Sequence, residues 1–394
     1  MANDAERQPL LQPAATHPRD GDINDVNSDC TVEPPDTASA WAEAQLSTKL
    51  PTAVLSFLIT GLAQSARLHV KFGRRGIAVL GPALRTLSAA ILICAPPFPV
   101  FLFGSFIFGL GTGFTDSGLM AWGSGVPYAN MVQGAMHGTW SVGCVIGPLL
   151  AVRISRKWHW YGYYRLLGVC YLLELLALAI AFRRDNATRY VEHKAKPETT
   201  ESDQPKYNPL RSKLPWLCAL YWFAYCSMES CYGDWIVTYT INVRHVEREV
   251  AARAASVFWS GMCIGRFTLS PITQYIGIRS AVLGYILISL AAQATLRGVE
   301  NTTTFFIVLA FIGAFFGPIF PSGVVLLGQK LPLEFHVQAV SAAAALGQSG
   351  GATAPLLVGY IADAFGIGRL LDVVIVFTVV LIGLWILFCR SAVD

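Results

Sequence analysis

Eleven long apolar runs constrain more than any other feature how this chain can fold. Each approaches the roughly 20 residues that an α-helix needs to cross a bilayer, because each helical residue adds about 1.5 Å. Backbone groups inside lipid must bond within the structure, so we expect these runs to be helices. The expected spans are 51–67, 77–95, 98–122, 131–152, 162–182, 214–240, 251–273, 280–297, 304–328, 338–362 and 369–389.

The composition agrees with a membrane protein and excludes several other classes. The chain is 54% hydrophobic and 14% charged, whereas a soluble protein carries about 25% charged residues. Its net charge of +4 gives no reason to expect a nucleic-acid partner. The nine cysteines lie mostly in apolar runs without a CxxC pair, so we read them as packing residues. Without a Walker, HExxH or GxSxG motif, we expect no enzyme, cofactor or metal.

A polar stretch at 183–213 divides the spans into two groups. It holds eight Lys or Arg residues, so the positive-inside rule predicts a cytoplasmic linker. We expect an N-terminal bundle of five spans at 46–182 and a C-terminal bundle of six spans at 214–390. Residues 1–45 are polar and acidic, which is typical of a disordered tail.

The same counting of spans assigns a side of the membrane to two possible glycosylation sequons. Asn301, in Asn301-Thr302-Thr303, falls outside the cytoplasm, where it can accept an N-linked glycan. Asn186 falls inside and should stay unmodified.

Several glycines, arginines and prolines recur at nearly constant spacing in the two groups of spans. This pattern predicts an internal duplication, with two pseudo-symmetric helical bundles related as parallel repeats. The matches are Gly73 with Gly277, Arg75 with Arg279, Gly109 with Gly313 and Gly113 with Gly317, each 204 residues apart, and Pro148 with Pro355, 207 residues apart.

The short cationic turn around Gly73 resembles the loop signature of the major facilitator superfamily. The residues that match its second half are Phe72, Gly73, Arg74 and Arg75; Val70 and Ala66 depart from it, where the family has an acid and a glycine. The resemblance implies an all-α fold of two six-helix bundles. Because this chain shows eleven spans, the first family helix is expected to be missing, through either a truncated gene prediction or a genuine eleven-span protein.

Three further stretches are similar to a fungal branch of this family, distantly related to fucose:proton symporters. They are YGDWIVTYTINVR (232–244), FGPIFPSG (316–323) and GQSGGATAPLLVG (347–359). The resemblance implies a monomeric secondary transporter that couples protons to a sugar-like solute or metabolite by alternating access. It implies the plasma membrane, with a vacuolar or endosomal membrane as the alternative. Export by antiport, and a receptor-like protein that transports nothing, remain the other hypotheses.

Two carboxylates inside the expected spans are candidates for proton coupling or substrate binding. Ionisable residues within a membrane are costly and are typical of proton relays and substrate pathways. Asp116 follows Gly113 in a Gly-x-x-acid pattern that the fucose symporters also carry, and Glu229 lies near the middle of its span. A purely structural carboxylate is the alternative for each.

Other polar residues suggest either a surface that binds the solute or a gate at the cytoplasmic side. His137 could bond a solute hydroxyl or relay a proton, or be a packing histidine, and Gln133 lies one turn earlier on the same face. We group Arg266 with the cytoplasmic loop signature of Gly277 and Arg279, as a gate residue near the cytoplasmic end of its span.

A glycine-proline pattern in the span at 131–152 resembles part of a motif of superfamily antiporters. Gly134, Gly143, Gly147 and Pro148 fit it, and Pro355 is the counterpart of Pro148 in the second half. Small residues at these positions predict close helix packing.

Overall fold

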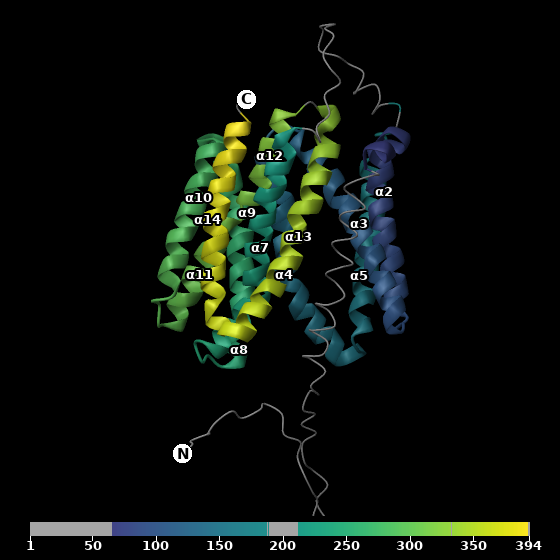
Figure 1. The fold of residues 1–394 in the computed structure, drawn as a ribbon. Helices are drawn as coiled ribbons and strands as arrows, with labels where there is room; N and C mark the ends of the chain where they lie inside the picture. The colour runs from purple at the N-terminus through teal and green to yellow at the C-terminus, as the bar shows by residue number, and fades with distance from the viewer. Residues whose placement is uncertain (1–64, 187, 189–211, 332, 393–394) are drawn as a thin grey trace, which may run out of the picture. The chain divides into compact units, whose positions relative to one another are not determined.

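The computed structural model describes residues 65–186, 188, 212–331 and 333–392, which are helical and contain no strand. This confirms the all-α class (Figure 1). The helices are α2 (Ser65–Ile93), α3 (Phe98–Ser124), α4 (Ala129–Trp158), α5 (Tyr161–Ala181), α7 (Lys213–Asn242), α8 (Arg248–Ala251), α9 (Arg253–Ile276), α10 (Ile278–Leu296), α11 (Thr302–Phe316), α12 (Ile319–Lys330), α13 (Leu333–Phe365) and α14 (Leu370–Ser391), with a 3₁₀ turn at Ile367–Arg369.

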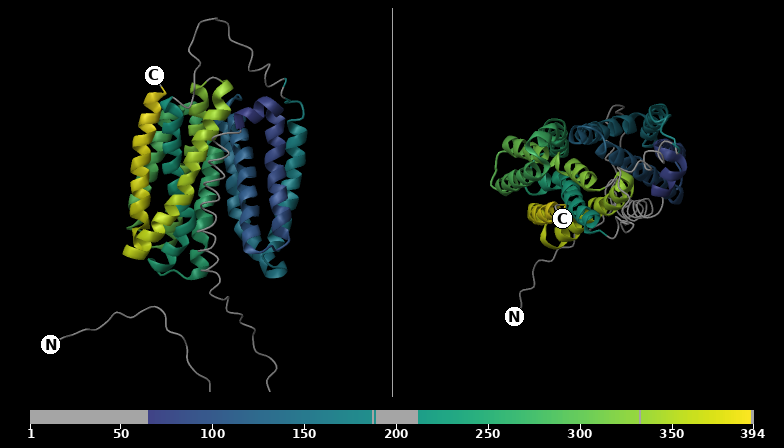
Figure 2. Two further views of the ribbon diagram at one scale, coloured as in Figure 1. Left: turned by 45° about the vertical axis from the view of Figure 1, so that its right-hand side comes forward. Right: turned by 90° about the horizontal axis from the view of Figure 1, so that it is seen from above.

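The helices up to α5 gather beside those from α7 onward, as the view from above shows (Figure 2). In Figure 1, α4, α7, α9 and α13 lie between the outer helices of the two groups. The expected tail at 1–45, most of the expected span at 51–67 and most of the linker at 183–213 lie outside the described residues.

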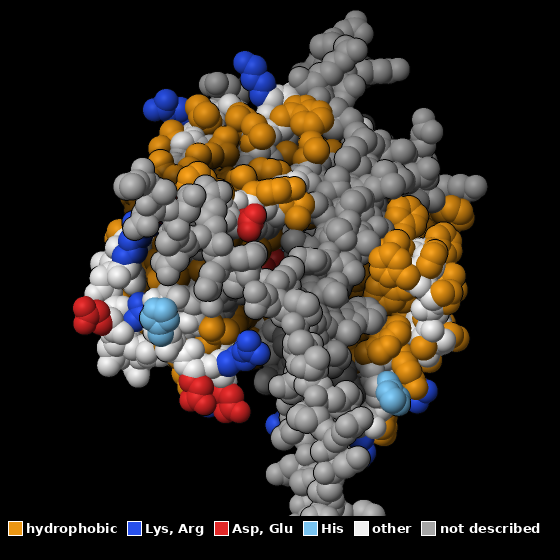
Figure 3. Space-filling view, turned by 60° about the horizontal axis from the view of Figure 1, so that its bottom comes forward, with side chains coloured by type: hydrophobic (Ala, Val, Ile, Leu, Met, Phe, Trp, Pro, Cys, Tyr) orange, Lys and Arg blue, Asp and Glu red, His pale blue; other side chains and the backbone are white. Residues whose placement is uncertain are grey.

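The surface of the described helices suits a lipid environment. Among the described residues, six segments are long and apolar enough to cross a membrane, and they include α5. Gly162 is the only residue of α5 that is buried, while Leu173 and Ile180 are 60% and 65% exposed. Figure 3 shows apolar side chains over the flanks and scattered charged side chains at the top, the left and the bottom of the view. Such extensive apolar exposure fits a helix that faces lipid.

The two glycines matched by the internal repeat share an unusual backbone conformation. Gly73 has a φ of 71° and Gly277 a φ of 95°, values that side-chain-bearing residues rarely adopt. Gly277 separates α9 from α10, whereas Gly73 kinks α2, whose helical run continues on both sides. At Gly73 two helical segments therefore meet at a non-helical residue, where the sequence predicts a turn.

The expected span at 304–328 is broken into α11 and α12 at Gly317-Pro318. Proline has no backbone N–H to offer the carbonyl one turn earlier, and its ring crowds that carbonyl. The carbonyls of Ala314 and Gly317, which would pair with Pro318 and Pro321 in an uninterrupted helix, are therefore available to other partners.

Glycines let α9 and α11 approach at backbone distance. A Cβ atom built on Gly265 would lie 1.8 Å from the carbonyl oxygen of Ala314, and one on Gly261 would lie 2.0 Å from that of Ala310. Any side chain here forces the helices apart. The close crossing holds the middle of α9, which carries the site described below, against α11.

We predict that Gly265→Ala destabilises the protein by about 1–3 kcal/mol, because the added methyl group overpacks this crossing. Gly284→Ala is the matched control, since a Cβ there has no neighbour within 4 Å. It should be neutral or stabilising by up to about 1 kcal/mol through helix propensity. Thermal unfolding of both variants in detergent measures the difference, and equal melting temperatures would contradict the packing account.

Candidate functional site

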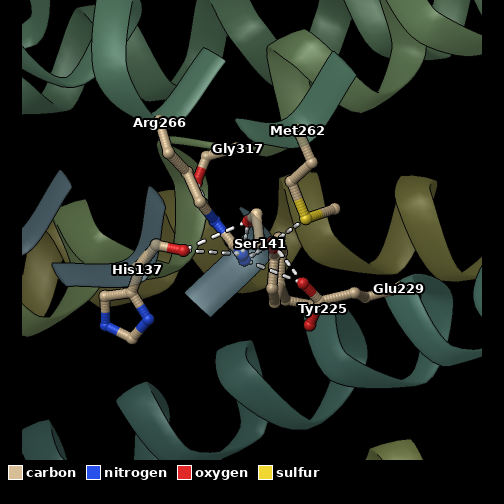
Figure 4. Close-up of polar contacts among 7 residues, drawn as sticks. All are labelled: His137, Ser141, Tyr225, Glu229, Met262, Arg266 and Gly317. Atoms are coloured by element: carbon tan, nitrogen blue, oxygen red, sulfur yellow. Dashed lines mark hydrogen bonds and ion pairs between the residues drawn. The ribbon is translucent and has the colours of Figure 1, made fainter. Parts of the chain in front are cut away.

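A buried arginine on α9 forms the centre of the candidate site (Figure 4). Arg266 is 2% exposed, and its Nη2 donates to Oε1 of Glu229 on α7 at 2.8 Å. The same nitrogen donates to the hydroxyl of Tyr225 at 3.2 Å, and that hydroxyl donates to Glu229 at 3.2 Å. The result is a three-membered network within the second group of helices.

The same guanidinium also reaches α4 in the first group of helices. Its Nη1 donates to Oγ of Ser141 at 2.6 Å and to the backbone carbonyl of His137 at 3.3 Å. The ring of Trp140 lies 5.3 Å from the guanidinium carbon, within reach of a cation–π interaction. Arg266 therefore links two helices that are far apart in the sequence.

Pro318 and Pro321, at the start of α12, explain which acceptor the remaining donor of Arg266 uses. Its Nε donates to the carbonyl of Gly317 at 3.3 Å, one of the two carbonyls whose helical partner is a proline. Gly317 also permits the approach, because a Cβ there would lie 2.8 Å from the backbone nitrogen of Arg266. Every nitrogen of the guanidinium thus has an acceptor, as a buried charge requires.

The two members of the ion pair differ in access. The side chain of Glu229 is 12% exposed and that of Arg266 is 2% exposed. Removing one partner of a buried pair costs roughly 3–5 kcal/mol, because the other charge is left uncompensated. Glu229 is therefore the more accessible member of the pair.

The placement of Arg266 corrects the sequence-based expectation. It lies midway along α9 and is bonded to α4, α7 and the α11–α12 break, rather than at the cytoplasmic end with Gly277 and Arg279. Counting spans from the loop signature missed this, because acceptors on distant helices hold the guanidinium in the interior. Arg279 does lie in the first turn of α10.

His137 and Gln133 lie next to this network on α4. The His137 ring packs against Phe320 of α12 at 5.1 Å between centroids, and its Nε2 is buried without a partner among the described residues. Gln133 is fully buried and donates to the carbonyl of Met120 on α3 at 2.7 Å. The predicted polar stripe therefore reaches Ser141, which lies one turn beyond His137 and was not predicted.

Asp116 lies apart from this network. No hydrogen bond or ion pair joins it to another residue in the described part of the chain, although Arg85 and Glu174 interact with it electrostatically. Arg85 pairs with Glu174 at 2.5 Å between Nη2 and Oε1. The two predicted carboxylates, Asp116 and Glu229, thus belong to different polar clusters.

The glycines toward the two ends of α4 have different surroundings. A Cβ on Gly134 would lie 2.4 Å from Cβ of Ser270 on α9, so this glycine permits close contact between α4 and α9. Toward the other end of α4, Gly143 has no neighbour within 4 Å and Gly147 would meet only Tyr163. Pro148 lies within α4, and Pro355 lies within α13.

The described residues offer no group of three metal-ligating side chains. The carboxylate of Glu229, the hydroxyl of Tyr225 and the guanidinium of Arg266 can support acid–base and hydrogen-bonding chemistry. Asn301 lies at the exposed start of α11, where its side chain caps the helix by accepting from the backbone nitrogen of Thr304 at 3.0 Å.

Fold and site together define a multi-pass helical membrane protein with a charged link between two groups of helices. Residues 37–296 match the sequence model of the Major Facilitator Superfamily. The chain belongs to this superfamily, which confirms the resemblance of its loop motif and supports secondary transport rather than catalysis.

Two named proteins are similar to the chain in sequence. "Bypass of stop codon protein 6" of Saccharomyces cerevisiae is 29% identical over 330 residues, 76% of this chain and 66% of that protein. "Protein TsgA homolog" of Buchnera aphidicola is 22% identical over 264 residues, 65% of this chain and 64% of that protein. The matched regions therefore span about two thirds of the length of each relative.

Solved transporter structures share the fold at low sequence identity. The E. coli fucose:proton symporter FucP is 16% identical with a TM-score of 0.64, over 90% of this chain and 94% of that chain. The human organic anion transporter MFSD10 (TETRAN) is 15% identical with a TM-score of 0.68, over 87% and 83%. At this identity the likeness establishes the fold alone.

We predict that Ser141→Ala destabilises the protein by about 1–3 kcal/mol, because it removes an acceptor from a buried charged donor. Thr139→Ala is the control on the same helix, since Thr139 is exposed and its hydroxyl bonds only to the carbonyl of Ala135. That change should stay within about 0.5 kcal/mol. Unfolding in detergent tests both variants, and equal effects would show that the link between Ser141 and Arg266 contributes nothing.

Proposed function

We propose that this protein is a proton-coupled transporter of a small organic solute and that Glu229 is its coupling carboxylate. The observation that carries the proposal is the buried pair of Glu229 and Arg266, whose guanidinium also holds Ser141 and the His137 carbonyl on α4. A change in the charge of Glu229 would therefore alter the contact between α4 of the first group of helices and α9 of the second.

Protonation of Glu229 removes the negative charge that faces Arg266. Leaving a buried charge uncompensated costs roughly 3–5 kcal/mol, and about 5.5 kcal/mol converts a 1:99 equilibrium between two states into 99:1. One proton can therefore provide most of the bias between two arrangements of α4 and α9. The bound solute supplies the remainder by preferring one arrangement.

α4 and α9 pack closely near the start of α4 but not farther along it, and this difference supports alternating access. Gly134 and Gly138 bring the helices together, since Cβ atoms there would lie within 2.8 Å of Ser270 and Phe267. Farther along α4, Gly143 faces open space and Ile146 is 45% exposed. Together with the cationic linker and loops, this favours a state closed toward the cytoplasm and open toward the outside.

A sugar-like solute or another small metabolite is the proposed substrate class. Both FucP and MFSD10 are named as transporters of small organic molecules, and Trp140 and Trp259 meet edge to face at 5.3 Å beside Arg266. Aromatic rings of this kind can stack on a sugar or an aromatic ring. Efflux by antiport is the second candidate, supported by the partial glycine-proline motif of α4.

Asp116 is the second candidate for the coupling carboxylate, and its separation from Arg266 makes it the weaker one.

We further propose that the protein acts as a monomer in the plasma membrane. Asn301 is then the site of an N-linked glycan on the outside.

We predict that Glu229→Gln abolishes accumulation driven by a pH gradient but preserves exchange of solute across the membrane. A glutamine still accepts the bond from Arg266, but it cannot take up and release a proton. A comparison of metabolites in cells with and without the protein identifies the solute, and sealed vesicles with an imposed pH gradient measure its accumulation.

Asp363→Asn is the control for this experiment, because Asp363 is an exposed carboxylate near the end of α13. It should accumulate solute as the wild type does. If Glu229→Gln also accumulates solute at the wild-type rate, Glu229 has only a structural role. If no variant and no wild-type protein moves any solute, the receptor-like alternative is favoured.

A further inference from the structure

A cavity of about 900 Å³ opens where one end of α3 and α4 meets α9, α10, α12 and the start of α13. This is the end that carries the cationic loop at Gly277. Its lining includes Asn130, Arg279 and Lys330. Asn130 is only 4% exposed, and its side-chain oxygen has no hydrogen-bond partner among the described residues.

Deeper in the protein, the same face of α4 carries a row of polar side chains at helical spacing. Gln133, His137 and Ser141 follow Asn130 at intervals of three and four residues, and such positions lie on one side of a helix. Gln133 Oε1 and His137 Nε2 are buried and lack a partner in the described part of the chain. On α9, the hydroxyl of Ser270 is also buried and unpartnered, beside Gly134.

Four orphaned polar atoms, three within two turns of α4 and one on the facing α9, require an explanation. Buried polar groups in proteins are nearly always bonded to protein or to ordered water. From Asn130 to His137 the helix rises about 10 Å, which three or four hydrogen-bonded groups spaced by about 2.8 Å can span. Water that entered from the cavity past Asn130 would satisfy all of these atoms at once.

We propose that this face of α4 holds a row of water molecules that connects the cavity to the Arg266–Glu229 pair and carries the coupled proton. The proposal rests on the proposed function, because it supplies the route by which Glu229 releases its proton to the cytoplasm after the outside has closed. Each step moves one proton from a donor to a water or to the His137 imidazole, which accepts at one ring nitrogen and releases from the other.

The charged and titratable groups near this row are few. Arg266 of α9 faces His137 through its bond to the backbone carbonyl, while α12 contributes the apolar Phe320. On α3, Gly123 and Met120 face Gln133, and Asp116 is one turn from Met120. At the cavity mouth the groups are Arg279, Lys330 and His336.

Hydroxyl-radical footprinting of the wild-type protein tests for the water directly, without any solute. Radicals formed from bound water oxidise side chains that touch it, so His137 and the buried Met120 should be modified despite burial. Met228 is the matched control, because it is equally buried but bonds to Thr378 on the far side of α7. Protection of His137 and Met120 equal to that of Met228 would overturn the proposal.

Gln133→Leu then tests whether this water conducts protons. In the vesicle assay, with a pH-sensitive dye inside and the solute identified there, the ratio of proton flux to solute exchange should fall roughly a hundredfold, the lower end of what a positioned proton-transfer group contributes. Gln293→Leu is the control, since Gln293 is also buried with an unpartnered amide nitrogen but lies on α10. An unchanged ratio in Gln133→Leu would show that the water carries no protons.

These outcomes are separate from a failure of the proposed function. If Glu229→Gln still accumulates solute, the coupling role of Glu229 fails whatever the footprint of His137 shows. If Glu229→Gln loses accumulation while His137 and Met120 stay protected, the coupling role stands and the water row is wrong.

Discussion

The need to pair one buried guanidinium organises the centre of this protein. A charge inside a membrane protein is tolerated only where acceptors surround it. Arg266 gathers its acceptors from α4, α7 and the break between α11 and α12. Removing any one of them leaves a donor unsatisfied. The network therefore couples these helices more tightly than apolar packing alone could, because apolar surfaces gain little from each other in lipid.

Backbone chemistry makes this network possible. The prolines at 318 and 321 leave two carbonyls without helical partners, and Arg266 takes one of them. Glycines at 265 and 317 bring α9 and α11 close enough for that bond to form. The buried charge of Arg266, the break between α11 and α12, and the close crossing of α9 and α11 thus depend on one another. In the proposed function, the more accessible Glu229 is the point at which a proton disturbs this arrangement, and the resulting strain falls on the contact between α4 and α9.

Much of the fold follows from the sequence, because long apolar runs in a membrane protein have one stable form. The duplication was visible as well, and the matched Gly73 and Gly277 both have a positive φ. The break at Gly317-Pro318 lies inside one expected span, although its proline is visible in the sequence. Arg266 was placed wrongly, and Ser141 and Tyr225 were missed, because their partners lie 37 to 125 residues away. Spacing along one helix reveals a polar stripe, but it does not reveal which distant helix the stripe meets.

The central claim is that the charge of Glu229 controls the contact between α4 and α9 through Arg266. Spin labels carried by non-natural amino acids at Lys157 and Arg253, both exposed near the ends of α4 and α9, can report that contact. Double electron–electron resonance on Glu229→Gln should show a population shifted to shorter distances than in the wild type, because the neutral side chain mimics the protonated state. Superimposable distance distributions would contradict the account.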